Sequence, residues 1–425
     1  MSEHFDTIII GAGAAGLAAG RELNRQGRRI LIIEARDRIG GRIFTRREAG
    51  FQTPIELGAE FVHGRPRATS ELIEKAGLSV EESSDVRLFS DNGKLKPLND
   101  FWSLVQSVNS QINPNEDITY QEFLDGIDAP DSAKRMARQY AQGFNAARAE
   151  IISAPAIALS ERAYAEIDGE KNFRVNEGYD AIIQELTREL PAESIRLSEA
   201  VLEVKWQFEN VAIRTSRATY TAKNAIITVP LGVLRAGTLA FDPLLTAKSD
   251  LLSHLEMGHA VKVILRFQHR WWEQIAGDFG YVVSHDAPIP TWWTQIPAAT
   301  NLLAGWAAGP AGEKLAKCRP TEILAQAAAS LSQIFGVSEN FIDGEVISCH
   351  SHNWSTDPFS LGAYSYPGVG GIEAARKLAQ PLENTLFFAG EATDSSGHHG
   401  TVHAAIASGY RAAHEIIART VPAVA

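Results

Sequence analysis

The sequence predicts an α/β protein in which a nucleotide-binding domain is interrupted by a second, α+β domain built on a mixed sheet. Three observations lead to this fold class. A strand–glycine turn–helix–strand unit fills the first 34 residues, more buried strands occur near residues 201–229 and 386–389, and 425 residues exceed the roughly 150 of one average domain. We place the nucleotide domain at residues 1–80, 195–240 and 385–425, and the second domain at residues 81–194 and 241–384.

The first unit begins with an apolar strand over residues 7–10. Gly11, Gly13 and Gly16 follow as GxGxxG and lead into a helix over residues 17–26. Gly11 permits a tight turn, Gly13 lets backbone approach a pyrophosphate at the positive end of the helix, and Gly16 lets helix and strand pack closely. A second strand, residues 29–33, ends at Glu34, whose carboxylate can accept hydrogen bonds from a ribose. This Rossmann-type pattern predicts dinucleotide binding; the alternative is a glycine-rich turn in an unrelated α/β protein.

A basic segment that contains two glycines continues from Glu34 through Arg36 to Gly40-Gly41-Arg42. The backbone of the two glycines and the cation that follows them can bind a second part of the same pyrophosphate. It can also hold an extended ligand that leaves the crevice of the first unit. The alternative is an exposed basic loop.

The remaining chain predicts mixed structure. Residues 70–195 are expected to be mainly helical, and Thr321 is expected to cap a helix over residues 322–335. A final helix is expected after a loop rich in glycine and histidine. The expected strands cover residues 201–204, 211–215, 225–229, 260–267 and 386–389, and the final helix covers residues 402–418.

Composition excludes several classes of protein. Apolar residues make up 45% and charged residues 21%, which is ordinary for a globular protein, and the net charge of −11 disfavours binding to a nucleic-acid backbone. Two cysteines provide no disulfide framework. No run of about 18 apolar residues predicts a membrane-spanning helix. The N-terminus lacks the pattern of a signal peptide, and the C-terminal Pro-Ala-Val-Ala carries no lipidation or peroxisomal signal, so we expect a cytoplasmic protein.

Several stretches of the chain, in order, resemble the flavin-containing amine oxidase family, which includes monoamine oxidases, polyamine oxidases and lysine-specific histone demethylases. The resemblance runs from Thr7 to about Ala413. It implies a glutathione-reductase-like FAD domain and a substrate domain with a six-stranded sheet flanked by helices, with motifs nearest to those of polyamine oxidases. The stretches are GAGAAGLAA, IIEARDRIGGR, ELGAEFVHG, IITVPLGVL, MGHAVKV, WSTDPFSLGAYSY and FFAGEATDSSGHHGTVHAAIASGYRAA.

The resemblance also implies the residues that contact FAD. Glu391 ends a strand at the carboxyl edge, where ligands bind in doubly wound sheets, and Thr401 opens the last helix with its N–H groups. Covalent-flavin members carry a Cys where this chain has Ala363, which implies non-covalent FAD. Besides the three glycines, the implied contacts are Ala15, Glu34, Arg36, Arg42, Glu60, Phe61, Val201, Glu391, Thr401 and Val402.

Lys262 matches the family's lysine that holds a water near flavin N5; without the resemblance a solvent-facing lysine is favoured. Tyr364 matches one wall of the family's aromatic cage. The second wall of monoamine oxidases is a Tyr where this chain has Thr401. Mammalian-type polyamine oxidases have a Tyr three places earlier, where this chain has His398, which can cover the flavin face.

Two further polar residues are candidates near the substrate. His63 matches a histidine of mammalian-type polyamine oxidases and can bond a substrate amine or, equally, the backbone of its loop. Glu60 replaces an uncharged residue; it can attract an ammonium group or pair with an arginine, and we favour the arginine. His399 and His403 are expected on one helical face beside His398, but no third-ligand pattern accompanies them, so we expect no metal.

The implied reaction is FAD-dependent oxidation of an amine C–N bond. Hydride passes to flavin N5, the imine hydrolyses to an aldehyde or ketone plus an amine, and O2 becomes H2O2. A polyamine-type substrate is favoured. An aromatic or alkyl monoamine is the alternative, because Trp292, Trp293 and Trp354 can line an aromatic pocket.

Other functions remain open but are disfavoured. An L-amino-acid oxidase would carry an arginine at the place of Phe61, and desaturases lack the lysine and the GAYSY pattern. A non-catalytic FAD-binding or chromatin-associated module is the alternative of another class. The expected partners are a small-molecule amine and O2, with no nucleic acid and no membrane, and the protein is expected to be a monomer or homodimer.

Overall fold

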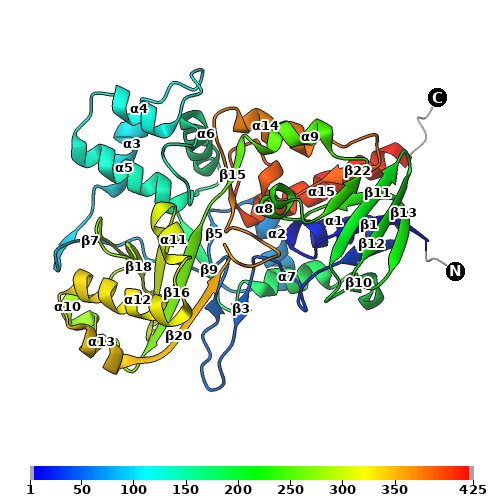
Figure 1. Ribbon diagram of the computed structural model, residues 1–425. Helices are drawn as coiled ribbons and strands as arrows, with labels where there is room; N and C mark the ends of the chain where they lie inside the picture. Colours follow the sequence, from blue (N-terminus) through cyan, green and yellow to red (C-terminus); the bar gives the residue numbers. More distant parts are fainter. Residues whose placement is uncertain (1–3, 421–425) are drawn as a thin grey trace.

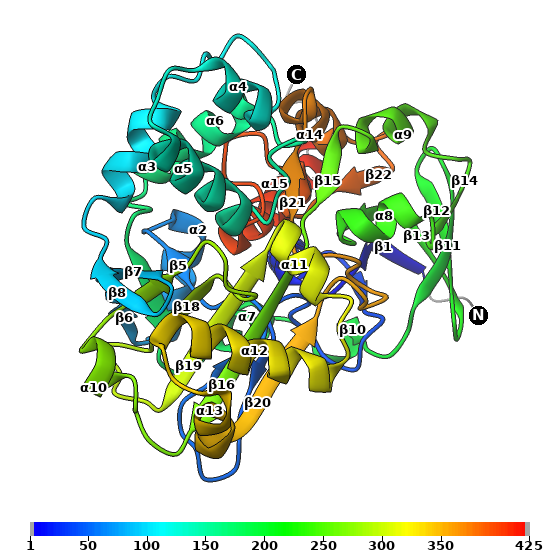
Figure 2. The ribbon, with the colours of Figure 1, turned by 60° about the vertical axis from the view of Figure 1, so that its left-hand side comes forward.

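The computed structural model describes residues 4–420; residues 1–3 and 421–425, which include the C-terminal Pro-Ala-Val-Ala, lie outside the described residues. Two large sheets organise the molecule. Figure 1 shows the sheet that contains β1 and β13 on the right and the sheet that contains β16 and β20 at the lower left. Figure 2 turns the second sheet toward the viewer. In the described part of the chain, no helix combines the length and the apolar character that a bilayer span requires.

The first sheet has eight strands in the order β10-β2-β1-β13-β12-β11-β14, and β22 pairs with β13 off this path. Its parallel strands are in register: Ile10 aligns with Ile33 and with Ile227, and Ile227 aligns with Phe388. Their carboxyl ends therefore meet at one edge, which brings together the segments that follow them. The strands are β1 (His4–Ile10), β2 (Ile30–Ile33), β10 (Ile195–Arg196), β11 (Val201–Gln207), β12 (Asn210–Thr215), β13 (Thr219–Ile227), β14 (Ala240–Asp242) and β22 (Leu386–Phe388).

Helices cover both faces of this sheet because successive strand residues point to opposite sides. Ile9 packs in one core with α1, α2, α7 and α15, whereas Ile8 and Ile10 pack in the other with α8, α14 and β15. The long α15 lies against α1 (Figure 1). These elements are α1 (Ala14–Arg25), α2 (Arg67–Ala76), α7 (Asp180–Thr187), α15 (Val402–Thr420), α8 (Leu231–Ala236), α9 (Thr246–Leu252), α14 (Gly371–Ala379), β15 (Leu255–Met257) and β21 (Ser365–Pro367).

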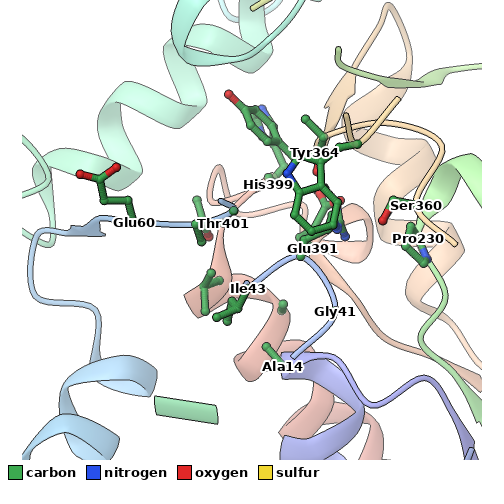
Figure 3. Close-up of a pocket in the computed structure, with 18 of the residues that line it drawn as sticks. Ala14, Gly41, Ile43, Glu60, Pro230, Ser360, Tyr364, Glu391, His399 and Thr401 are labelled. Atoms are coloured by element: carbon green, nitrogen blue, oxygen red, sulfur yellow. Dashed lines mark hydrogen bonds and ion pairs between the residues drawn. The ribbon is translucent and has the colours of Figure 1, made fainter. Parts of the chain in front are cut away.

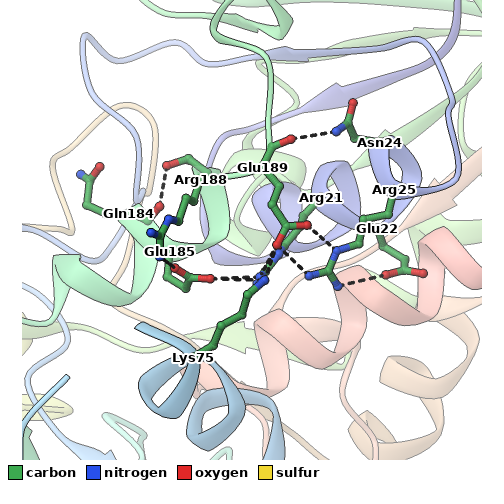
Figure 4. A network of polar contacts seen from close by, with 10 residues as sticks. Arg21, Glu22, Asn24, Arg25, Lys75, Gln184, Glu185, Arg188 and Glu189 are labelled. Carbon is green, nitrogen blue, oxygen red and sulfur yellow. Dashed lines mark hydrogen bonds and ion pairs between the residues drawn. The ribbon is translucent and has the colours of Figure 1, made fainter. Parts of the chain in front are cut away.

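A charge network, buried at Arg21 and Glu185 and partly exposed elsewhere, joins α1, α2, α7 and the chain after α7 (Figure 4). The Arg21 guanidinium donates from Nη2 to Glu185 at 3.1 Å and to Glu189 at 2.9 Å, although Arg21 is only 2% exposed. Arg25 donates to Glu189 at 2.6 Å, and Lys75 from α2 pairs with the same carboxylate. Glu189 thus pairs with Arg21 and Arg25 of α1 and with Lys75 of α2, and it links both helices to the chain after α7.

The second sheet has seven strands in the order β20-β16-β19-β18-β17-β7-β8. On β16, Val261, Val263 and Leu265 enter a core with α11 and α12, so the intervening Lys262 and Ile264 point to the opposite face. The elements here are β7 (Arg87–Asp91), β8 (Lys94–Pro97), β16 (Ala260–Phe267), β17 (Tyr281–Val283), β18 (Thr291–Trp293), β19 (Leu302–Ala308), β20 (Val346–Asn353), α10 (Glu273–Ala276), α11 (Pro310–Leu315), α12 (Pro320–Phe335) and α13 (Glu339–Glu345).

A group of four helices stands above the second sheet at the upper left of Figure 1. Residues from α4, α5 and α6 share a core around Tyr120 and Ile157. The helices are α3 (Phe101–Asn109), α4 (Tyr120–Gly126), α5 (Asp131–Phe144) and α6 (Ala154–Ala165). Short strands complete the fold: β3 (Thr45–Arg46), β4 (Ile55–Glu56), β5 (Val62–His63), β6 (Val80–Glu82) and β9 (Asn172–Val175).

Several expected elements differ from the structure. Residues 70–195 contain four strands, β6 to β9, besides helices, and the second sheet has seven strands rather than six. Thr321 lies inside the first turn of α12, which begins at Pro320 and is capped by Arg319 and Glu322. The first helix begins at Ala14, three residues earlier than expected.

The packing also bears on the division into domains. The α7 residues Ile182 and Ile183 enter the core around α1, and the α14 residues Ala374 and Leu378 enter the core around β1. Both helices were assigned by sequence to the second domain. We therefore propose that the nucleotide domain also includes α7 and α14.

Candidate active site

One cavity of about 780 Å³ runs from the carboxyl edge of the first sheet past Lys262 and on into the four-helix group. It is lined by the loops after β1, β2 and β13, by the segment after β4, and by residues of α3, α5 and α6. Such a volume falls within the roughly 300–1,000 Å³ of small-molecule sites. The cavity has a glycine-rich end and an aromatic end.

The glycine-rich end is a backbone cradle. Gly11 has φ +107°, and a Cβ on Gly16 would lie 1.9 Å from the Gly11 oxygen, so both positions require glycine. Gly13 precedes α1 without any side-chain cap, and a Cβ there would meet open space. The N–H groups of the first turn of α1 are therefore free to bind an anion, and Ala15 lines the cavity beside them. These features fit the pyrophosphate of a dinucleotide.

Glu34 is fixed at the end of β2 in the same cradle. Its two carboxylate oxygens accept hydrogen bonds from the backbone N–H groups of Ala12 at 2.8 Å and Arg36 at 2.9 Å. Arg36 in turn donates to Asp357 at 2.6 Å and to Ser360 at 2.9 Å. Glu34 also lines the cavity, as a ribose-binding carboxylate requires.

Glu391 lies buried between the cradle and the aromatic end (Figure 3). Its carboxylate accepts from Arg42 at 2.8 Å, from the Ser365 hydroxyl at 2.5 Å and from the Gly400 N–H at 3.1 Å. Burial alone would raise its pKa, but Arg42 and the Ser365 hydrogen bonds together lower it, so Glu391 is ionised. It therefore holds Arg42 and the loop before α15 in place.

Helix α15 points its N-terminus at the cavity. The Thr401 hydroxyl accepts from the Ala404 N–H at 3.2 Å, which makes Thr401 the N-cap, and Val402 begins the helix. Both residues line the cavity. The first N–H groups of this 19-residue helix have no intrahelical partner and can stabilise negative charge.

Lys262 is only 3% exposed and lies in a buried ion cluster. Its ammonium group is 2.5 Å from Glu60 and donates to the Gly58 carbonyl at 3.2 Å. Glu60 also accepts from Arg174 at 2.8 Å and from the Trp293 indole at 3.0 Å. Burial would raise the Glu60 pKa, but Lys262 and Arg174 lower it to about 2. The expected arginine partner of Glu60 is thus Arg174, and Lys262 is a second partner that the sequence did not indicate.

Aromatic side chains wall the other end of the cavity. The Tyr364 hydroxyl donates to the Phe144 carbonyl at 2.6 Å, and the Phe144 ring lies 5.5 Å from His63 and 5.4 Å from Tyr164. His63 bonds Asn172 at 2.6 Å rather than the backbone of its loop, and burial lowers its pKa, so it is neutral at pH 7. These residues form an apolar chamber beside Lys262.

The structure does not bring His398 to the wall of the cavity. The His398 ring packs on His403 at 4.8 Å and on Tyr164 at 6.0 Å and does not line the cavity, whereas its neighbour His399 does. Asp394 causes this arrangement because it accepts the backbone N–H groups of Gly397 and His398 and fixes the turn. Figure 3 shows His399 near Tyr364.

The geometry also corrects the expectation that His399 and His403 share a helical face, because His399 precedes α15. Within residues 4–420, no group of three or more His, Cys, Asp or Glu side chains is arranged to hold a metal.

The structure brings nearly all other candidates to this one cavity. Gly16 lies behind the cradle, in the helix–strand contact described above. Trp293 and Trp354 line the cavity, but Trp292 is buried in the core of the second sheet and bonds Ser330. The lining candidates are Gly11, Gly13, Ala15, Glu34, Arg36, Arg42, Glu60, Phe61, His63, Val201, Lys262, Tyr364, Glu391, Thr401 and Val402.

Several lining residues were not predicted as site residues, among them Phe144 and Tyr164 of the chamber, His399 and Glu161. His399 is adjacent to His398, the residue that the family resemblance indicated, and only the turn geometry separates them. Glu161 of α6 reaches the aromatic end from a helix with no recognisable motif, so no local signal marked it.

Comparisons with known proteins agree with this site. A model of the family described as flavin containing amine oxidoreductase matches residues 14–417. Polyamine oxidase 4 of Oryza sativa subsp. japonica is 29% identical over 96% of this chain and 88% of its own length. Lysine-specific histone demethylase 2 of Homo sapiens is 29% identical over 97% of this chain, which spans 53% of that protein.

Solved structures share the fold. Wild-type putrescine oxidase bound to putrescine superposes with a TM-score of 0.84 at 20% identity, covering 99% of this chain and all of that one. Cyclohexylamine oxidase from Brevibacterium oxydans IH-35A gives a TM-score of 0.83 at 20% identity, covering 98% of this chain and 99% of that one. Since the family model matches residues 14–417, which include Glu34, Arg42, Lys262 and the chamber, this chain belongs to the flavin-containing amine oxidoreductases and is a flavin-dependent enzyme that oxidises amines.

Proposed function

We propose that this enzyme binds FAD non-covalently and oxidises the C–N bond of a di- or polyamine, with O2 as the electron acceptor. The observation that carries the proposal is the single cavity that joins a dinucleotide cradle to an apolar chamber with a buried, charged Lys262 at its wall. When bound there, the flavin supplies the redox chemistry, accepting a hydride from the amine α-carbon and passing the electrons to O2.

The protein residues hold the cofactor in this proposal. The first turn of α1 and Arg42 bind the pyrophosphate, Glu34 binds the ribose, and the N-terminus of α15 binds the flavin end that gains negative charge. Ala363 lies at the cavity wall and offers no thiol for a covalent link. Lys262, anchored by Glu60, is a fixed hydrogen-bond donor beside the chamber and orients a water molecule there.

The chamber favours a neutral amine at the reacting end. An ammonium nitrogen has no lone pair to drive loss of hydride, and an apolar site disfavours the charged form of an amine. Tyr364, Phe144 and Tyr164 supply aromatic surface there, and His63 is neutral and adds no positive charge. The residues therefore select the deprotonated amine and exclude bulk water from it.

The substrate class rests on a different argument from the one the sequence offered. Glu60 is fully engaged by Lys262 and Arg174, so it is not available to a substrate ammonium. The polyamine proposal is supported instead by the continuation of the cavity past the chamber to residues of α3 and α5, by the polyamine oxidases among the relatives and by the putrescine oxidase fold.

The second candidate substrate is an aromatic or alkyl monoamine, which the aromatic walls around Phe144 and Trp293 favour. An amino acid is disfavoured, because the cavity offers its carboxylate no free arginine. Arg36 pairs with Asp357, Arg42 with Glu391 and Arg87 with Asp85.

The test is an anaerobic panel of amines scored by bleaching of the flavin absorbance, followed by kcat/KM in air with H2O2 detection. We expect 1,4-diaminobutane, spermidine or spermine to exceed benzylamine and phenethylamine by about tenfold or more. A reversed order would assign a monoamine rather than a polyamine as the substrate. Bleaching without H2O2 would assign an electron acceptor other than O2, and no bleaching by any amine would refute the proposal.

We further propose that the protein works in the cytoplasm as a monomer or homodimer. Its two cysteines, Cys318 and Cys349, are unpaired, which suits a reducing compartment. Sedimentation of the flavin-loaded protein would give the oligomeric state, and fractionation of the source cell would give the compartment.

A further inference from the structure

Five glutamates line the cavity, and Glu161 differs from the other four. Glu34 is held by two backbone N–H groups, Glu60 pairs with Lys262 and Arg174, and Glu391 pairs with Arg42. Glu170 is exposed at the surface. Glu161 is half-buried, yet among the described residues no Lys, Arg or His pairs with it.

One oxygen of Glu161 is fixed and the other is free. The Asn109 amide donates to Oε1 at 2.5 Å, and Asn109 is itself buried and accepts the Tyr120 hydroxyl at 2.5 Å. The second oxygen, Oε2, has no hydrogen-bond partner within residues 4–420. A carboxylate that is partly desolvated, positioned and unpaired is costly unless a cation joins it, and burial accordingly raises its pKa.

The position of Glu161 places it beyond the chamber. Glu161 precedes Tyr164 by three residues on α6, so the two side chains lie on the same helix face, one turn apart. Tyr164 contacts Phe144, whose carbonyl binds Tyr364 at the inner end. Tyr140 stacks on Phe144 at 5.3 Å on the outer side.

The surroundings of Glu161 suit an ammonium group rather than a bulky cation or an anion. Tyr140 and Trp102 line the cavity near this end, and their rings meet edge to face at 5.5 Å. Aromatic faces attract a cation, and a carboxylate oxygen completes its hydrogen bonding. A chain with a cationic end can therefore lie along the rings with its head at Glu161.

We propose that Glu161 determines substrate specificity by accepting the distal ammonium group of a di- or polyamine whose other nitrogen is oxidised beside Lys262. This inference rests on the proposed amine substrate class and adds the residue that distinguishes a diamine from a monoamine of equal length. Glu161 touches the substrate but takes no part in the bond changes.

The experiment compares 1,4-diaminobutane with n-butylamine in the flavin-loaded wild type and in Glu161→Gln. Glutamine keeps the shape and the bond from Asn109 but removes the charge. We expect kcat/KM for the diamine to fall roughly ten- to hundredfold, mainly through KM, because a charge-assisted hydrogen bond is lost. The value for n-butylamine should stay within about threefold, since no group of this monoamine reaches Glu161. Glu166→Gln is the matched control: it removes the same charge from the exposed C-terminal end of α6 and should leave both values within about threefold.

The outcomes separate the two proposals. Equal losses for both amines would make Glu161 a structural anchor for Asn109, and an unchanged diamine value would remove it from recognition; either result overturns the inference while leaving a diamine-preferring enzyme intact. A wild type that does not prefer the diamine over n-butylamine would refute the substrate class itself, and the role of Glu161 with it.

Discussion

The ion cluster of Glu60, Lys262 and Arg174 supports a prediction with a defined magnitude. Glu60→Gln removes the only negative charge of the cluster and leaves two buried cations facing each other. The pKa of Glu60 is lowered from 4.5 to about 2. A shift of that size corresponds to about 3 kcal/mol in favour of the ionised form. Leaving a buried charge uncompensated costs about 3–5 kcal/mol, so we expect Glu60→Gln to lower the free energy of unfolding by that amount.

A double-mutant cycle isolates the pair. Lys262→Met alone leaves Glu60 with Arg174, and the double variant Glu60→Gln/Lys262→Met leaves Arg174 as the only charge. We expect the double variant to be more stable than the sum of the single effects by about 1–3 kcal/mol, measured by urea unfolding of the flavin-loaded proteins. Strict additivity would refute the coupling that the 2.5 Å contact implies.

The cycle has a pH signature. Because the folded-state pKa of Glu60 lies below its unfolded value of 4.5, its contribution is present above pH 4.5 and is lost as the pH falls toward 2. The Glu60→Gln variant should lose this part of the acid sensitivity.

The same Lys262→Met variant should retain FAD but slow flavin reduction or reoxidation about a hundredfold, or about 2–3 kcal/mol. Unchanged rates in both half-reactions would limit Lys262 to a structural role.

Three other predictions follow from the site and its surroundings. Acid or heat denaturation should release intact FAD into the supernatant, since Ala363 offers no linking thiol; yellow precipitate would contradict this. Glu56 is buried and its pKa is raised to about 7, so its protonated form stabilises the fold and this contribution is lost as the pH rises from 4.5 to 7. In urea unfolding at different pH values, the decrease in stability over this range should be about 3 kcal/mol smaller in Glu56→Gln than in the wild type. The value of kcat/KM should rise from pH 6 to 9, and the midpoint of the rise should shift with the pKa of the amine, because the reacting nitrogen must lose its proton. A midpoint that stays the same for amines of different pKa would assign the titration to the protein.

The nucleotide unit could be predicted from the sequence because its signals are local. An apolar strand, three glycines at fixed spacing and Glu34 lie within 34 residues, and the family motifs fixed the remaining cradle residues in the same way. Each of these positions depends on backbone geometry that only a few residue types permit.

The strands at residues 87–97 were mistaken for helix although a local signal was present. Asn92-Gly93 joins β7 to β8 with positive φ at both residues, the hallmark of a two-residue hairpin turn, but the flanking strands are too polar to show a clear alternation. Glu161 and the Lys262–Glu60 contact could not be predicted, because they join residues that are far apart in sequence. Glu60 and Lys262 are separated by 202 positions, and no sequence pattern near either residue indicates a contact with the other.

The order of strands in the first sheet has a consequence for biosynthesis. The central β13 pairs with β1, near residue 4, and with β22, at residues 386–388. Helix α1, which follows β1, packs against α15, which follows β22. A nascent chain therefore carries the βαβ unit through most of translation without its final strand and helix. The cradle is completed only when residues 390–402 have left the ribosome, so FAD can act as a template for folding only after that point, and a chain that stalls earlier exposes the edge of β13 at residues 225–227 to other polypeptides.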